Sequence, residues 1–169
     1  KVLTSSKKVG RPLSFDRDTA LEKAMLVFWQ NGYETASISD LTAAMGVTAP
    51  SIYTAFGDKK SLFLEAANLY AGTPEAFEQT LYKSETAYEA ANQILLESAK
   101  AFTGADTPRG CLLASATASG SDEAADVRSF VTSIRNNIRG LLEKRIDKDI
   151  ADNLLPQATN SASLAALVI

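Results

Sequence analysis

ISDLTAAMGVTAPSIYTAF, residues 38–56, is the stretch that decides the fold of this chain. Ser37, directly before it, has the short oxygen-bearing side chain that favours a helix start. Apolar residues then recur at the three- and four-residue steps of one helical face: Ile38, Leu41 and Met45. Gly46 follows where a helix ends in a left-handed residue, because glycine has no Cβ to clash there. The spacing therefore predicts a short helix that closes in a tight glycine turn.

A second helix is expected directly after this turn. Thr48 can cap its start, and Pro50 falls in its first turn, where a missing N–H costs nothing. Ile52 and Phe56 are four residues apart and are expected to face inward. Helix, tight turn and helix form a helix-turn-helix, whose second helix enters the DNA major groove.

Small and hydroxyl-bearing side chains remain for the outward face of the second helix. Hydroxyl groups donate or accept hydrogen bonds at base edges, a threonine methyl contacts a thymine methyl, and alanine allows close approach. The outward set is Ala49, Ser51, Tyr53 and Thr54. An ordinary helical hairpin also favours glycine at its corner, so the spacing alone leaves DNA binding and a structural hairpin open.

The wider region resembles the DNA-binding domain of the tetracycline-repressor (TetR) family over about the first 70 residues. The residues that carry the resemblance are Phe28, Gly32-Tyr33, Thr35 to Ile38, Gly46 to Thr48, Ser51 to Tyr53, Phe56 and Asp58-Lys59. Thr42 and Met45 depart from the commonest pattern, where alanine is frequent, and both still fit a helix. The resemblance implies an all-α fold, in which a three-helix DNA-binding domain is joined by a linking helix to a helical ligand-binding and dimerisation domain.

The resemblance also implies roles for single residues at the DNA. Lys59 matches the family's phosphate-contacting lysine and Tyr53 its tyrosine, and Ser37 is expected to hold a phosphate beside them. The complete predicted set of DNA-binding residues is Arg11, Ser37, Thr48, Ala49, Pro50, Ser51, Tyr53, Thr54 and Lys59. Arg11 belongs to a basic N-terminal arm, which either follows phosphates and reaches a minor groove or is a solvated tail.

Composition and charge limit the remaining function classes. Residues 1–60 carry eight basic and six acidic side chains, and since the whole chain has a formal net charge of −3, the remainder carries −5. A mildly basic front on an acidic body fits a DNA reader. One Cys and no His exclude an internal disulfide and histidine-based triads or metal sites. With no apolar run of about 18 residues and no visible signal peptide, a cytoplasmic, nucleoid-associated protein is expected.

Breaks in the pattern divide the chain into a predicted DNA-binding part over 1–57, a linking helix over 58–71 and an effector-binding and dimerisation part over 72–169. Further helices are expected over 16–31, 75–83, 84–103, 111–119 and 121–150. Five basic side chains of the last helix are expected on solvated flanks: Arg128, Arg135, Arg139, Lys144 and Arg145. The apolar run over 163–169 stops without a cap, which predicts further residues. In the TetR family the last two helices form the dimer interface.

Aromatic and sulfur side chains of the second half are the candidates for an effector pocket: Tyr70, Phe77, Tyr88, Phe102 and Cys111. Ordinary core packing is the alternative for each of them. Cys111 follows Arg109 near a helix start, a setting that favours a reactive thiol, so sensing of oxidants, electrophiles or soft metals stands beside inert packing. One Cys, two Met and no His disfavour a metal site within one chain, and no cofactor is expected.

The pattern and the resemblance together predict a ligand-responsive transcriptional regulator. It is expected to bind a near-palindromic double-stranded operator as a homodimer, with half-sites about one DNA turn (about 34–36 Å) or a multiple apart. Repression, and release by a small-molecule effector, follow from the resemblance alone. The rival is a helical small-molecule carrier or adaptor whose hairpin is only structural. An enzyme is the least favoured class, because neither paired carboxylates nor an activated nucleophile is evident.

Overall fold

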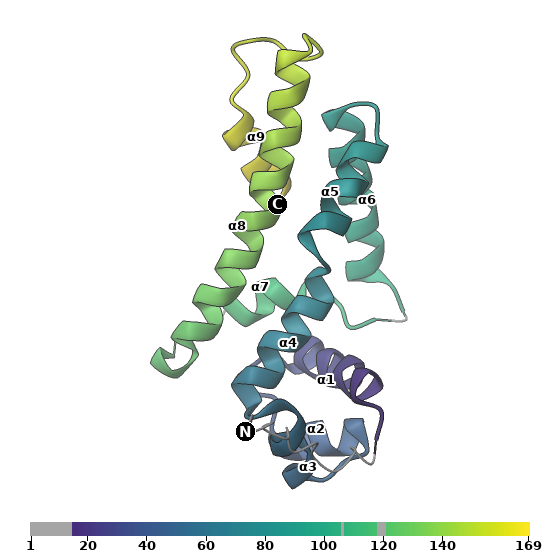
Figure 1. Ribbon diagram of the computed structural model, residues 1–169, viewed down its shortest axis with the longest axis vertical. Coiled ribbons are helices and arrows are strands. Elements are labelled where there is room, and N and C mark those ends of the chain that lie inside the picture. Colours follow the sequence, from purple (N-terminus) through teal and green to yellow (C-terminus); the bar gives the residue numbers. More distant parts are fainter. Residues whose placement is uncertain (1–14, 106, 118–120) are drawn as a thin grey trace, which may run out of the picture.

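A computed structural model describes residues 15–105, 107–117 and 121–169, and every regular element in these ranges is helical (Figure 1). The elements are α1 (Arg17–Asn31), α2 (Ile38–Met45), α3 (Ala49–Phe56), α4 (Lys59–Ala71), α5 (Pro74–Lys83), α6 (Ala87–Thr103), α7 (Leu112–Thr117), the 3-10 turn η1 (Asp122–Ala124), α8 (Ala125–Ala151) and α9 (Ser161–Val168). The expected all-α fold is confirmed. Across the described ranges, no helix combines the length and apolar character that crossing a membrane requires.

The molecule is elongated, with α1, α2 and α3 gathered at one end (Figure 1). Helix α4 leads away from this group toward an α5–α6 pair, and the long α8 runs beside α9 on the other side. Short α7 packs against α1, α4 and α8. The three-helix unit is therefore joined to the rest through α4, α7 and the start of α8.

Side-chain caps set several helix starts. The Asp16 carboxylate accepts the Thr19 N–H at 2.7 Å, which begins α1 where the sequence predicted it. Thr86 likewise accepts the Glu89 N–H at 3.2 Å. Because Thr86 occupies this capping position, α6 begins at Ala87, three residues later than the start expected at residue 84.

One hydrophobic core, named the DNA-side core after the predicted DNA-binding helices, fills the three-helix unit and continues beyond it. Phe28 contacts Phe63 edge-on, with 5.2 Å between ring centroids, and Tyr33 meets the same ring at 5.1 Å. The cluster runs from α1–α4 into α7 and the first turns of α8. Its fully buried members include Leu41, Ile52, Leu62, Leu112, Val127 and Val131. The DNA-side core therefore ties the helix-turn-helix to α8 by continuous packing.

A second cluster, the distal core, lies at the other end and joins α5, α6, α9 and the second half of α8. Its buried members are Leu81, Ala87, Ala90, Leu142, Ile146 and Ala165. Along α6, Ala87 and Ala90 are buried in the distal core and Ile94 packs against it, whereas Tyr88 is 76% exposed and Leu95 50% exposed. Helix α6 thus rests on its neighbours through the face that carries Ala87, Ala90 and Ile94.

The expectation that Arg145 lies on a solvated flank is wrong. Arg145 is 3% exposed and forms an ion pair with Asp149, which is 1% exposed, one turn further along α8. Arg145 also donates to the Glu85 carbonyl at 2.8 Å, and Asp149 accepts the Ala87 N–H at 2.6 Å. The pair holds the α5–α6 corner on α8. The spacing of Arg145 and Asp149 along α8 could not reveal this role, because the Glu85 carbonyl and the Ala87 N–H belong to a distant turn.

Candidate nucleic-acid interface and effector cavity

A reciprocal capping box begins α2 at the predicted residue. The Asp40 N–H donates to the Ser37 hydroxyl oxygen at 3.1 Å, while the Ser37 N–H donates to the Asp40 carboxylate at 2.9 Å. The Ser37 hydroxyl donates to the same carboxylate at 2.6 Å. Hydrogen bonds from the Ser37 hydroxyl and then its N–H lower the pKa of Asp40 below its ordinary value. Ser37 remains exposed, so its hydroxyl is held in place at the surface.

Gly46 makes the corner between α2 and α3. Its φ of 71° and ψ of 31° lie in the left-handed region, where a residue with a Cβ is strained. Its N–H and that of Val47 both donate to the Thr42 carbonyl, at 3.0 and 3.3 Å. Val47 then packs against the DNA-side core. The turn therefore fixes the direction in which α3 leaves α2.

Helix α3 buries one face and exposes the other, as predicted. Ile52 and Phe56 are 0% and 4% exposed, whereas Tyr53 is 50% exposed and Thr54 lies in solvent. The Thr54 hydroxyl donates back to the Pro50 carbonyl at 2.8 Å, which leaves its oxygen lone pairs as acceptors. The outward face of α3 is therefore small, polar and ordered.

The cap predicted for Thr48 is wrong in one respect. Thr48 occupies the position before α3, but its side chain accepts no capping hydrogen bond. Its hydroxyl instead shares a hydrogen bond with the Ser51 hydroxyl at 2.9 Å. Pro50 in the first turn removes one donor that a cap would otherwise satisfy. The two hydroxyls therefore form an exposed polar pair at the start of α3.

Arg17 holds the other end of α3, and the sequence analysis did not single it out. Its guanidinium donates twice to Glu65 of α4 at 2.8 Å and twice to the Ala55 carbonyl at 3.2 and 3.3 Å. It also lies 4.3 Å from the centroid of the Phe56 ring. Arg17 thus binds α1, α3 and α4 together at one point. An arginine at a helix start carries no sequence signal for such a contact, because its partners lie 38 and 48 residues away.

Lys59 and Lys60 at the start of α4 make different contacts. The Lys59 ammonium donates to the Glu34 carbonyl at 3.1 Å and lies 4.9 Å from the Tyr33 ring centroid. Burial lowers the pKa of Lys59 from its ordinary value, and the nearby Glu34 charge opposes that shift. Lys60 pairs with Asp126 of α8 at 2.9 Å, and this hydrogen-bonded pair raises the pKa of Lys60. The two lysines therefore lie at the junction between the three-helix unit and α8.

A second contact crosses the same junction. The Ser121 hydroxyl, just before η1, donates to the Glu34 carboxylate in the α1–α2 loop. Together with the pair between Lys60 and Asp126, it places the start of α8 against both the loop and α4.

Arg11 of the predicted DNA-binding set lies outside the described residues.

A cavity of about 830 Å³ lies between the two hydrophobic cores. Its wall is formed by α1, α4, α5, α6, α7, α8 and the end of α9. Four of the five predicted pocket residues line it: Tyr70, Phe77, Phe102 and Cys111. Tyr88 is not among its lining residues, because it points to solvent at the start of α6. Trp29 also lines the wall and donates its indole N–H to the Gly110 carbonyl at 2.8 Å.

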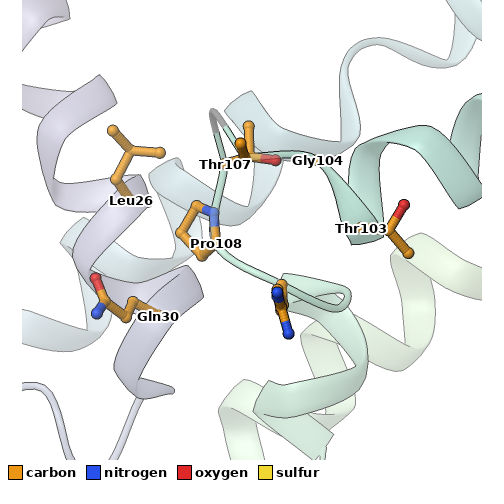
Figure 2. A pocket seen from close by; sticks show the side chains of 8 residues that line it. Leu26, Gln30, Thr103, Gly104, Thr107 and Pro108 are labelled. Carbon is orange, nitrogen blue, oxygen red and sulfur yellow. The ribbon is translucent and has the colours of Figure 1, made fainter.

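A more polar hollow of about 750 Å³ lies between α1 and the loop that follows α6. Figure 2 shows Leu26 and Gln30 on one side, facing Pro108 and Thr107 of the loop. The Thr107 hydroxyl is already engaged with the Ala101 carbonyl at 2.9 Å. The described residues that line this hollow are exposed or half-buried, whereas Trp29 and Leu113 are buried in the wall of the apolar cavity, so the apolar cavity is the stronger candidate for a ligand.

Known proteins resemble this chain in sequence and in fold. The family model described as bacterial regulatory proteins, tetR family, matches residues 20–66, which span α2, α3 and most of α1 and α4. The TetR family transcriptional regulator CifR, solved as a cysteine mutant complexed with 26-bp double-strand operator DNA, is 39% identical, with a TM-score of 0.86 over 94% of this chain and 83% of CifR. The chain belongs to the TetR family.

Curated TetR-type relatives agree with this assignment. The HTH-type transcriptional repressor ComR of Escherichia coli (strain K12) is 38% identical over 129 residues, or 75% of this chain. BdcR, a second repressor of the same strain, is 29% identical over 72% of this chain. The chain spans 61% and 62% of the lengths of these two proteins. Family membership therefore rests on the helix-turn-helix together with the fold of a large part of the second half.

Proposed function

We propose that this TetR-family chain is a transcriptional repressor that reads double-stranded operator DNA through the outward face of α3. The observation that carries the proposal is the geometry of α3, which buries Ile52 and Phe56 and presents Tyr53 and Thr54 outward from a rigid glycine corner. The repressor names of ComR and BdcR, and the operator DNA bound to CifR, support it.

The proposed contacts divide into two groups. Ala49, Ser51 and Thr54 read base edges in the major groove, with Thr48 and Pro50 at the entry of the helix. Tyr53, Lys59 and Ser37 hold phosphates, and Arg11 extends these contacts from the N-terminal arm. Lys59 uses one N–H group on the Glu34 carbonyl, so its ammonium keeps two donors for a phosphate.

The proposal includes a homodimer and a small-molecule effector, with residues 1–57 as the DNA-reading part, α4 as the link and residues 72–169 as the regulatory part. Exposed leucines of α9, Leu164 at 40% and Leu167 at 82%, support pairing of two copies. The cavity between the cores supports an effector site. An effector that changes the angle between the cores alters the spacing of the two α3 helices, and a coupling of about 1–3 kcal/mol changes operator affinity roughly 5- to 150-fold. We propose no catalytic activity, and the bacterial nucleoid is the proposed site of action.

Fluorescence anisotropy tests the proposal. The protein is titrated into DNA from upstream of its own gene and into a scrambled duplex, each across a salt series. Tight, sequence-dependent binding with two protein chains per operator supports the repressor. If neither this DNA nor an unbiased selection of DNA sites yields a specific duplex, DNA reading is excluded. In that case the cavity favours a carrier of small molecules.

A further inference from the structure

The effector cavity lies where the DNA-side core and the distal core face each other. Trp29 and Leu113 reach its wall from the DNA-side core, and Phe77 and Ile94 reach it from the distal core. Ile138 lines it from the stretch of α8 between the two clusters. A molecule in the cavity therefore contacts both cores at once, which gives the chemistry of the wall a direct bearing on regulation.

Charge is confined to the mouth of this cavity. Three of its twenty lining residues are charged, and all three are exposed: Glu22, Glu97 and Arg135. Two of them already have partners, since Glu97 pairs with Lys100 at 3.0 Å and Arg135 donates to the Ile169 carbonyl at 3.1 Å. The buried part of the wall is made of Trp29 and Leu113. An ionised group placed deep in the cavity would lose its hydration without a counter-ion, which is strongly unfavourable.

Tyr70 brings a polar group into the wall. Its ring stands edge-on to Trp29, with 4.8 Å between centroids and an interplanar angle of 80°. Burial, and then a hydrogen bond with Cys111, raise the pKa of Tyr70, so the phenol keeps its proton at neutral pH. A neutral phenol both donates and accepts a hydrogen bond. Ser98 is the other lining residue with a hydroxyl group, so the described wall offers two uncharged hydroxyls within a largely apolar surface.

We infer that the cavity takes an uncharged, predominantly apolar molecule that carries one hydrogen-bonding oxygen, which Tyr70 holds. The volume of about 830 Å³ is that of a site for a drug-sized ligand. This inference rests on the proposed function for its regulatory meaning, but the binding itself is measured without DNA. It specifies the ligand by charge and polarity, and it predicts that organic anions and cations bind more weakly than an uncharged molecule of the same shape.

Trp29 is the one tryptophan of the chain, so its emission reports on this cavity directly. The full chain is titrated with three probes that share one cage and do not absorb where tryptophan does: 1-adamantanemethanol, 1-adamantanecarboxylate and 1-adamantanemethylammonium. The alcohol is expected to change the emission saturably and to bind at least about tenfold more tightly than either ion. Tyr70→Phe is expected to weaken the alcohol about two- to tenfold.

A matched pair of α6 variants locates the probe. Ala101 lines the cavity and Ala99 does not, and both are exposed, so phenylalanine at either position leaves the fold intact. Ala101→Phe is expected to abolish alcohol binding and Ala99→Phe to leave it unchanged. Equal effects of the two variants overturn the inference, as does an ion that binds as tightly as the alcohol, or no saturable change with any probe. Operator binding of the probe-free protein is measured separately, so its failure would concern only the proposed function.

Discussion

Replacing Asp149 by alanine tests the buried clamp that holds the α5–α6 corner on α8. The change removes the carboxylate that pairs with Arg145 and accepts the Ala87 N–H at 2.6 Å. Arg145, 3% exposed, then keeps its hydrogen bond to the Glu85 carbonyl but has no counter-charge. Its guanidinium cannot lose its proton, so the charge stays buried and unpaired.

The expected loss of stability follows from this burial. Removing one partner of a buried ion pair costs about 3–5 kcal/mol, against a total stability of about 5–15 kcal/mol for a native protein. For a chain of this size, each kcal/mol corresponds to a midpoint shift of about 2–4 °C, so we expect a decrease of about 6–20 °C. The double variant Arg145→Met with Asp149→Leu is expected to recover part of the loss, since no charge remains buried, although the Ala87 N–H still lacks an acceptor.

Thermal unfolding is followed by circular dichroism, which reports all helices, and by Trp29 fluorescence, which reports the DNA-side core. Asp149→Ala is expected to lower the circular-dichroism midpoint more than the Trp29 midpoint, because the clamp belongs to the distal end. Asp147→Ala is the control, since Asp147 lies on the same helix but is exposed; we expect it to stay within about 0.5 kcal/mol of wild type. If Asp149→Ala behaved like Asp147→Ala, the reasoning from burial would be refuted.

Three further predictions concern the DNA-binding half. Arg17→Lys keeps the charge, but a single ammonium cannot replace the Nε and Nη2 donors to the Ala55 carbonyl together with the Nη2 contact to Glu65. It is expected to destabilise the protein by about 1 kcal/mol and to weaken operator binding more than scrambled-DNA binding in anisotropy titrations. An equal loss on both duplexes would contradict a positioning role. Lys59→Ala is expected to weaken all duplexes alike and to reduce the salt slope by about 0.9 for each copy of the chain, or about 1.8 for the dimer. An unchanged slope would remove Lys59 from the phosphate contacts. The lowered pKa of Asp40 means that its cap stabilises the folded state above the ordinary value of 3.8 and that this contribution is lost as pH falls below it. Asp40→Asn is therefore expected to be less stable than wild type at pH 7 in denaturant titrations, and the difference is expected to shrink as the pH falls well below 3.8. A constant difference between them would exclude the carboxylate as the cause.

Local sequence signals were sufficient to predict the helix-turn-helix. The cap at Ser37, the glycine corner and the apolar positions of α2 and α3 all lie within a few residues of the contacts that they make. Thr48 shows the limit of such signals, because its hydroxyl shares a hydrogen bond with the Ser51 hydroxyl and accepts none from a backbone N–H of α3. Either contact is available to a hydroxyl at that position, and sequence cannot rank two hydrogen bonds of similar strength.

The second half was less predictable because helical periodicity states which residues share a face but not what covers that face. Tyr88 was predicted to line the effector pocket, yet it is 76% exposed, while Ala87 and Ala90 beside it on α6 are buried in the distal core. The prediction for Arg145 was wrong in the opposite sense, because it was expected in solvent and is buried. A basic residue on a long amphipathic helix is usually solvated. The burial of Arg145 depends on the carbonyl groups of a corner that lies 60 residues earlier.

The sequence by itself determined the all-α class, the TetR helix-turn-helix and the residues that face outward on α3, because helix caps, glycine turns and apolar spacing act over a few residues. Only the tertiary structure decided which long-range contacts form: the Arg17 contacts across α1, α3 and α4, the Arg145 and Asp149 clamp, and the apolar cavity between the two cores. These features depend on how helices far apart in the chain pack together, and packing is set by the combined shape and charge of all the partners rather than by any one segment.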